Sequence, residues 1–338
     1  TVDFSMYTFS RKPIFQALVR ALERGVTLRG IVDKGLFRNL KRYCTVTGCD
    51  LPEPYGTEPY QTASVAERQN LVASDPLYRE ASLPEKLQLL GYRSGAAPLV
   101  QKAPGSRRLV HNKLVLIDGQ YLLSGSGNWS STAVTINLEN LVSWHSRSEP
   151  LIVESFRCML DVIWSGDGNL IARDLPSCQT PKTFFAPSRN GEGTIQHRII
   201  QAINESTGPI RIVMHHLVEP DIIAALKDAA DRGRSVQVLF DDDDCNGSEP
   251  QLDLLRNTRG VEFRFVPTNC QLFQLSHNKF GIFGAELVIN GSANWSKAGL
   301  TKNYENFALF LGAEQTKPFH DFFDRVWPEA LVRANCQC

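Results

Sequence analysis

Five polar residue types recur twice in this chain at the same mutual spacing. Each set holds a histidine, a lysine, a serine, an asparagine and a glutamate, and matched positions lie 166 residues apart. The sets are His111, Lys113, Ser126, Asn128 and Glu139, followed by His277, Lys279, Ser292, Asn294 and Glu305. Turn formation does not require these residue types at fixed spacing, so the duplication points to chemistry.

The local sequence predicts how these side chains are presented. A His-x-Lys pair on a strand has both side chains on one face, because strand residues alternate with a period of two. Apolar Leu109, Leu114, Leu116 and Ile117 indicate a buried strand whose polar face lines a pocket. The Gly-Ser-x-Asn-Trp-Ser segment that follows is expected to end a strand and to begin a turn or helix, where N–H groups suit an anion. Together the two sets would bind a phosphoryl group and provide a nucleophile and an acid.

The chain resembles the phospholipase D superfamily, whose signature is His-x-Lys-x4-Asp followed by Gly-Ser-x-Asn. The first copy is complete, with Asp118 after Lys113 and with Gly125 before Ser126. The second copy departs at one position, where Gly284 replaces the aspartate. The resemblance covers both halves and therefore most of the chain. It implies an α/β fold of two similar repeats packed as a pseudo-dimer, so that a monomer would supply a complete active site.

The resemblance also implies two displacements at phosphorus, with no metal and no other cofactor. His111 would attack to form a phosphohistidine, while His277 would protonate the leaving oxygen and then activate water, although the sequence alone does not order the two. Two ammonium groups and two amides would hold the non-bridging oxygens. These belong to Lys113, Lys279, Asn128 and Asn294.

The remaining polar residues of the motifs are predicted to support this chemistry. Each histidine needs a carboxylate that fixes its tautomer, and Glu139 and Glu305 are the candidates. Ser126 and Ser292 either support the phosphate pocket or stabilise a turn. Asp118 is interpreted as structural because its counterpart is a glycine, with an asymmetric site as the alternative.

A βαβ pattern also occurs twice, with matched positions 208 residues apart. The predicted elements are a strand at 4–9, a helix from Pro13 and a strand at 26–33, then a strand at 214–217, a helix at 222–230 and a strand at 236–241. The offset falls from 208 to 166, so the first repeat carries an insertion of 42 residues. It lies within about residues 34–101, with helices near 66–72 and 83–90. His215 and His216 are interpreted as core or surface histidines, with a role beside the site as the alternative.

The predicted domains are a first repeat at 1–165, a linker at 166–182 and a second repeat at 183–338. Each repeat is expected to hold a mixed central sheet flanked by helices and to end in a helix, at 151–164 and at 316–327. The second repeat begins with a strand and an amphipathic helix that have no counterpart before Thr1. Repeat symmetry therefore suggests that about 25 residues are missing there.

Composition narrows the class of protein. The 338 residues carry no net charge, which neither favours nor excludes a polyanionic substrate. No apolar run approaches the roughly 20 residues of a membrane-spanning helix. The eight cysteines are even in number and predict disulfides in a secreted or periplasmic protein, with free thiols in the cytosol as the alternative. Their spacing does not fit a zinc site.

Three substrate classes remain. A nuclease acting on DNA or RNA is favoured by basic residues that can bind phosphates, with Tyr43, Tyr55 and Tyr60 interleaved to stack on bases. The basic residues are Lys34, Arg38, Lys41, Arg42, Arg107 and Arg108. A phospholipase D or phosphatidyltransferase would need exposed apolar loops, and none is evident in the sequence. A non-catalytic member of the fold is the third class, and two intact His-Lys-Asn sets argue against it.

Overall fold

A computed structural model describes residues 1–45, 48–94, 96–104, 108–166, 175–188, 194–242, 253–255 and 257–332. The chain divides into two compact units. The first unit comprises Thr1–Leu123, Asn128–Ser131 and Ser143–Ile171. The second unit comprises Ser124–Gly127, Thr132–Val142 and Ala172–Cys338. Two short segments with the sequence of the first repeat therefore belong to the second unit.

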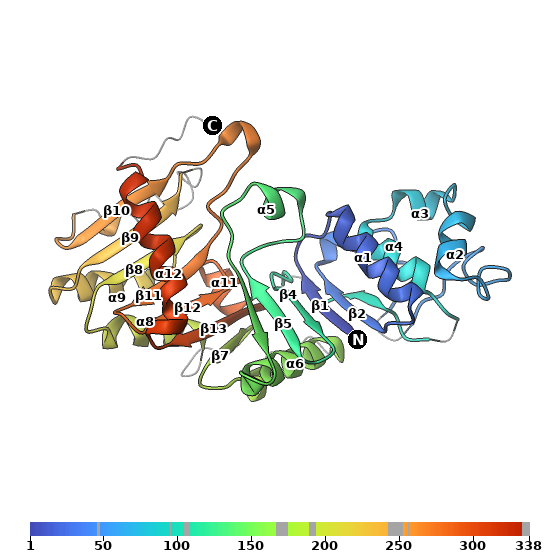
Figure 1. Cartoon of the computed structure of the whole chain (residues 1–338), viewed down its shortest axis with the longest axis horizontal. Coiled ribbons are helices and arrows are strands. Elements are labelled where there is room, and N and C mark those ends of the chain that lie inside the picture. The colour runs from blue at the N-terminus through green and yellow to red at the C-terminus, as the bar shows by residue number, and fades with distance from the viewer. Residues whose placement is uncertain are drawn as a thin grey trace. The chain divides into compact units, whose positions relative to one another are not determined.

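A mixed sheet forms the centre of the first repeat (Figure 1). Its strand order is β3-β2-β1-β4-β5-β6, in which β1 pairs parallel with β2 and antiparallel with β4. The strands are β1 (Val2–Met6), β2 (Leu28–Val32), β3 (Val100–Lys102), β4 (Lys113–Ile117), β5 (Tyr121–Gly125) and β6 (Leu141–His145). The helices outside the insertion are α1 (Lys12–Glu23), α5 (Ser131–Thr135) and α6 (Pro150–Trp164).

The two faces of this sheet are covered by different helices. Phe4 points into the apolar core that contains α1, whose Phe15 and Leu18 are also buried there. Because neighbouring strand residues alternate, Asp3 and Arg29 point to the other face. Arg29 Nη1 donates to Asp161 of α6 there, at 2.5 Å. The sheet therefore lies between helices on both faces, as predicted.

A second mixed sheet has the order β10-β9-β8-β11-β12-β13-β7. Its strands are β7 (Thr183–Ala186), β8 (Ile210–Met214), β9 (Val236–Asp241), β10 (Val261–Val266), β11 (Lys279–Phe283), β12 (Leu287–Gly291) and β13 (Glu305–Leu311). The helices α8 (Ile195–Glu205) and α9 (Pro220–Asp231) contribute to the apolar core on one face. On the other face α12 (Ala313–Val326) contacts β11, β12 and β13. The short helix α11 (Lys297–Thr301) follows β12, and η2 (Leu175–Cys178), η3 (Cys270–Leu272) and η4 (Trp327–Glu329) are 3-10 turns.

The predicted strands at 4–9 and 214–217 are misplaced. The ladders end at Met6 and Met214, and the extended residues beyond them leave the sheet. Phe9 and Leu217 instead form isolated bridges with the tryptophans of the two Gly-Ser-x-Asn-Trp-Ser motifs. Extended backbone with alternating apolar residues looks the same in sequence whether or not it joins a sheet.

The insertion between β2 and β3 is a compact helical segment. It contains η1 (Lys34–Leu36), α2 (Val65–Leu71), α3 (Pro76–Glu80) and α4 (Leu83–Gly91), of which α3 was not predicted. Buried Arg68 donates to four backbone carbonyls, and buried Glu85 accepts from the N–H groups of Asn39 and Leu40. Charged groups inside a small core must be bonded in this way, because desolvation of an unpaired charge is costly.

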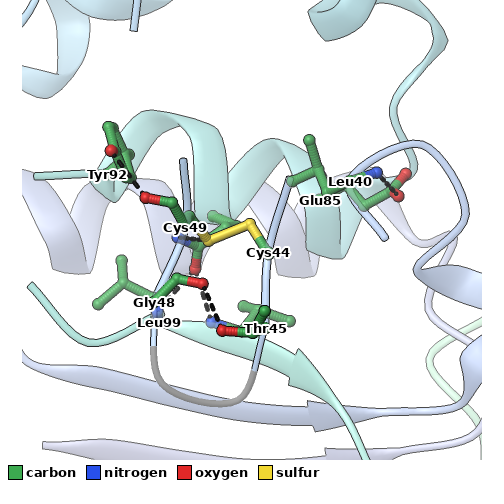
Figure 2. Close-up of a disulfide and its surroundings, with 10 residues drawn as sticks. Leu40, Cys44, Thr45, Gly48, Cys49, Glu85, Tyr92 and Leu99 are labelled. Carbon is green, nitrogen blue, oxygen red and sulfur yellow. Dashed lines mark hydrogen bonds between the residues drawn. A yellow bond between two sulfur atoms is a disulfide. The ribbon is translucent and has the colours of Figure 1, made fainter. Parts of the chain in front are cut away.

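A disulfide joins Cys44 to Cys49 at the edge of this insertion (Figure 2). The loop that it closes is tied by the Thr45 N–H to the Gly48 carbonyl at 2.8 Å. The Tyr92 hydroxyl donates to the Cys49 carbonyl at 3.0 Å. Cys158 and Cys178 are also disulfide-bonded, so the prediction of disulfides is confirmed for these four cysteines. Cys245, Cys336, Cys338 and the side chain of Cys270 lie outside the described residues.

No helix in the described parts of the chain combines the length and the apolar character needed to cross a bilayer.

Gly291 is required by the close approach of β12 to β13. A Cβ at this position would lie 2.0 Å from the backbone oxygen of Asn306, and one at the matched Gly125 would lie 2.2 Å from that of Asn140. Gly48 has open space around it and serves as a control. We expect Gly291→Ala to lower the free energy of unfolding by about 1–3 kcal/mol, the usual cost of overpacking, while Gly48→Ala changes it little. Thermal unfolding measures both, and equal melting temperatures for wild type and Gly291→Ala would contradict this expectation.

Candidate active site

A buried aspartate holds the backbone just before each His-x-Lys motif. In the first unit Asp33 Oδ2 accepts from the N–H of Val110 at 3.1 Å, and in the second unit Asp241 accepts from the N–H of Ser276. Asp33 directly follows β2 and Asp241 is the last residue of β9, and the two are matched at the offset of 208 residues. Because each bond is made one residue before the histidine, it fixes where the imidazole is presented.

Glu139 lies against His277 in the second unit. His277 Nδ1 is 2.9 Å from Glu139 Oε2 and 3.0 Å from Oε1. A short ladder brings them together, since Leu138 donates to the carbonyl of Leu275 at 2.8 Å and accepts from the N–H of His277 at 2.9 Å. Asn137 Oδ1 also accepts from the N–H of Leu275, at 3.1 Å. The carboxylate of the first sequence copy thus orients the histidine of the second copy.

Each motif glutamate is held by a serine and an asparagine. The Ser126 hydroxyl donates to Glu139 Oε2 at 2.6 Å, and the Asn137 amide donates to Oε1 at 3.1 Å. The second copy repeats both bonds, at 2.6 and 3.4 Å, with Ser292, Asn303 and Glu305. Both serines therefore position a carboxylate.

Several groups act on the ionisation of Glu139. Burial favours its neutral form and would raise its pKa. The contact with His277, the Lys279 ammonium and the Ser126 hydroxyl outweigh burial, so the pKa of the Glu139 carboxyl lies below its ordinary value. The residue is accordingly a carboxylate at neutral pH, able to stabilise a protonated imidazole.

The two motif lysines are buried beside their histidines. Lys113 Nζ donates to the backbone carbonyl of His111, and Lys279 Nζ donates to that of His277, each at 2.5 Å. Lys113 Nζ also lies 5.5 Å from the centre of the Tyr7 ring. The carbonyl bond anchors each ammonium group beside its histidine.

An aromatic ring packs edge-on against each histidine. Tyr7 and His111 have ring centres 5.0 Å apart, and His215 and His277 have ring centres 5.1 Å apart. Tyr7 and His215 are matched at the offset of 208 residues. This placement supports the alternative interpretation of His215, a role beside the site.

In each Gly-Ser-x-Asn-Trp-Ser motif, two backbone N–H groups are hydrogen-bonded to other parts of the protein. In each copy the N–H groups of the serine and the tryptophan donate to backbone carbonyls at 3.0 or 3.1 Å. The donors are Ser126, Trp129, Ser292 and Trp295. The expectation that this backbone binds an anion is therefore wrong for these four groups. In the first unit Asn128 Oδ1 accepts from the N–H of Thr8 at 3.3 Å, while Asn294 Oδ1 is buried in the second.

Asp118 belongs to a hairpin turn. It and Gly119 have positive φ angles of 52° and 64°, and Gln120 N–H donates to the Ile117 carbonyl at 2.9 Å. This is the type I′ geometry that favours Asp-Gly between two strands. Gly284, at the matched position, has φ of 65°. The shared backbone conformation explains why glycine can stand there, and it supports the structural interpretation of Asp118.

The predicted substrate-binding residues divide into three groups. Lys34, Arg38, Lys41 and Arg42 are exposed and follow the carboxyl end of β2, next to Asp33; we call them the basic cluster. Arg108 is half-buried, and Arg107 lies outside the described residues.

The predicted stacking role is wrong for two of the three tyrosines. Tyr55 and Tyr60 are fully buried, and their hydroxyls donate to Asp75 at 2.9 Å and to the Leu89 carbonyl at 2.6 Å. Tyr43 is half-buried, with the Arg42 guanidinium 4.7 Å from its ring centre. The interleaved tyrosines are mainly core residues of the insertion.

Among the described residues, no three histidine, cysteine, aspartate or glutamate side chains gather closely enough to hold a metal ion.

Comparison with known proteins agrees with the duplicated geometry. A family profile described as "Cardiolipin synthase, PLD-like domain" matches residues 1–164 and 199–327. This chain belongs to the phospholipase D superfamily.

The curated relatives of this chain have low sequence identity to it. The mitochondrial cardiolipin hydrolase of Chlamydomonas reinhardtii is 25% identical over 130 residues, which cover 38% of this chain and 56% of the relative. The same-named protein of Canis lupus familiaris is 26% identical over 140 residues, covering 41% and 53%. The chain thus matches about half the length of these curated relatives.

The solved phosphatidylserine synthase of Haemophilus influenzae Rd KW20 superposes with a TM-score of 0.65. The two sequences are 10% identical, and the superposition covers 99% of this chain and 83% of the synthase chain. At that identity the likeness establishes the fold alone.

Sequence reasoning missed several residues around the two histidines. Asn137 and Asn303, which hold the glutamates, share the offset of 166 residues, and Tyr7 lies 208 residues before His215, the histidine for which a role beside the site is the alternative interpretation. Extending the comparison of the copies to every polar or aromatic position would have found them.

The Glu139–His277 contact can be tested by Glu139→Gln, which keeps the shape and removes the charge. We expect kcat/KM on a phosphodiester to fall about 100-fold, within the usual range for acid–base catalysis. Glu154→Gln, in an exposed pair with Arg157, is the matched control and should leave kcat/KM unchanged. Wild-type kcat/KM in Glu139→Gln would contradict an orienting role.

The same variant should change how stability depends on pH. A carboxyl whose folded pKa is depressed stabilises the fold above its ordinary pKa, and this contribution disappears as pH falls through the folded pKa. The stability gap between wild type and Glu139→Gln should therefore be full at neutral pH and narrow below about pH 4.5. A gap that does not change with pH in thermal unfolding would show that Glu139 is not charged in the fold.

Proposed function

We propose that this protein is a metal-independent phosphodiesterase that acts through a phosphohistidine intermediate. The observation that carries the proposal is the buried Glu139 carboxylate at 2.9 Å from His277 Nδ1, next to the buried Lys279. The same residue types recur at matched positions of the sequence with His111 and Lys113. Two displacements at phosphorus need a nucleophile and an acid, and two histidines provide both.

In the first displacement a neutral imidazole nitrogen bonds to phosphorus, the ester P–O bond breaks, and the second histidine protonates the leaving oxygen. In the second displacement water attacks phosphorus, the P–N bond breaks, and the second histidine takes the proton of the water. Glu139 favours the charged form of His277, which supports His277 as the acid and His111 as the nucleophile. Glu305 remains the carboxylate proposed to orient His111.

The non-bridging oxygens carry the negative charge that repels a nucleophile. Lys113 and Lys279 are proposed to neutralise it, with Asn128 and Asn294 as further hydrogen-bond donors. Burial strengthens these interactions, because Coulomb energies rise as the dielectric constant falls. The chemistry then requires no divalent ion.

We propose a phospholipid as the substrate class. The family profile is named for cardiolipin synthase, and the curated relatives are named cardiolipin hydrolases. Both names concern phosphodiesters of lipids. The burial of Tyr55 and Tyr60 also removes most of the aromatic part of the case for nucleic acid.

A nuclease is the second candidate, and the exposed basic cluster favours it. Lys34, Arg38, Lys41 and Arg42 leave the sheet beside Asp33, one hydrogen bond from the residue that precedes His111. Four cations there would attract a polyanion such as DNA or RNA. The same charges would also attract an anionic lipid surface.

A substrate panel in excess EDTA tests the function. It contains single- and double-stranded DNA, RNA, phospholipid vesicles and bis(p-nitrophenyl) phosphate. We expect hydrolysis of phospholipid and of the small diester in EDTA, and a loss of at least about 10³-fold in either His111→Ala or His277→Ala, without additivity in the double variant. Strict dependence on a divalent ion would refute the mechanism. Cleavage of nucleic acid without cleavage of phospholipid would select the second candidate.

We propose that the protein works in an oxidising compartment, secreted or periplasmic, because four of its cysteines form disulfides. Titration of the denatured, unreduced protein from its native source should find at most four free thiols among the eight cysteines. Eight free thiols would contradict this location.

A further inference from the structure

An exposed apolar pair lies just before the second His-x-Lys motif. Leu272 is 52% exposed and Phe273 is 78% exposed, the largest value among the exposed large apolar residues of the described chain. We call this pair the apolar tip. Isolated surface leucines are ordinary, but two adjacent, exposed, large apolar side chains in one turn are not.

The backbone holds the apolar tip outward. Phe273 has φ of 53°, a left-handed conformation that is uncommon for a bulky residue. The turn is closed by Asn269, whose carbonyl accepts from the N–H groups of Leu272 and Gln274, each at 3.1 Å. The Gln274 side chain accepts in return from the N–H of Asn269 at 3.0 Å. Residues held in such uncommon backbone conformations occur often at functional sites.

The apolar tip is connected rigidly to the residues around His277. The Gln274 amide donates to the carbonyl of Ile136 at 2.7 Å, and the next N–H, of Leu275, donates to Asn137, which also holds Glu139. Only three residues separate Phe273 from His277. Whatever the tip touches is therefore held close to the proposed acid.

Charge and size indicate what the apolar tip binds. No acidic side chain occurs from Val266 to Lys279, so nothing in this segment repels an anionic surface. Exposed apolar side chains in a segment without negative charge suit a phospholipid surface. Two side chains fall well short of the roughly 800 Å² per partner of a stable protein interface.

We propose that Leu272 and Phe273 insert into the surface of a phospholipid aggregate and hold the second His-x-Lys motif at the lipid interface. This inference rests on the proposed phospholipid substrate. It predicts faster hydrolysis of phospholipid in vesicles than of the same lipid as a monomer, because the tip gains apolar burial only at an interface.

The test compares wild type with Leu272→Ser/Phe273→Ser, and Leu151→Ser serves as the control because Leu151 is 67% exposed on α6. Binding is measured by co-sedimentation with vesicles of phosphatidylcholine containing a minority of phosphatidylglycerol. We expect the double variant to bind about 10- to 100-fold more weakly and the control to bind as wild type does. Hydrolysis of bis(p-nitrophenyl) phosphate should be unchanged in both, which shows that the variants are folded.

Binding and hydrolysis separate the two proposals. Equal vesicle binding by wild type and the double variant, or no binding by wild type, would overturn the role of the apolar tip whatever the catalytic result. Loss of single-stranded DNA binding with unchanged vesicle binding would overturn it in favour of a base-stacking role for Phe273. Weak vesicle binding in the double variant would support the tip even if no phospholipid were hydrolysed, and the failure would then lie in the proposed substrate.

Discussion

The contact between the Glu139 carboxylate and the His277 imidazole is the interaction on which the candidate site depends. A buried carboxylate is costly unless its oxygens are bonded, and here Ser126, Asn137 and His277 all bond to it. The orientation of the His277 ring therefore depends on a residue that lies 138 positions earlier in the chain. Its consequence is that the second sequence copy is not self-sufficient, because its histidine is held by a carboxylate of the first copy.

This constraint explains features of the fold that otherwise look arbitrary. Residues 132–142 belong to the second unit, although their sequence is that of the first repeat. They do so through backbone pairing of Leu138 with Leu275 and His277. Gly125 and Gly291 end the strands just before the motif serines, and they allow close approach to the asparagine after each motif glutamate. The serine hydroxyls of the signature therefore position carboxylates, and the glycines make room for this arrangement. The backbone N–H groups of the serines bond to carbonyls of the protein and not to an anion.

The sequence predicted the mixed α/β repeats, the helix from Pro13, the helix at 222–230 and the strand at 236–241, because periodic apolar patterns and duplicated turns encode them. It also identified Ser126 and Glu139, which the structure places in one hydrogen-bonded group with His277. It did not reveal that Glu139 contacts His277, since that depends on the backbone pairing of Leu138 with Leu275 and His277, which are far apart from it in the sequence. The tyrosines of the insertion were misread because aromatic residues among basic ones have the same pattern in a small core as on a binding surface. The exposure of Leu272 and Phe273 was missed because a short apolar pair before a strand normally predicts burial.

A phosphohistidine mechanism is tested most directly by trapping the intermediate. The protein is mixed with a ³²P-labelled phosphodiester that has a good leaving group, quenched in alkali and mapped by peptide. The mechanism predicts an acid-labile, alkali-stable label on the peptide that contains His111, with more label in His277→Ala, where activation of water is lost. Efficient hydrolysis with no label on His111, or with label on an aspartate or serine, would contradict it.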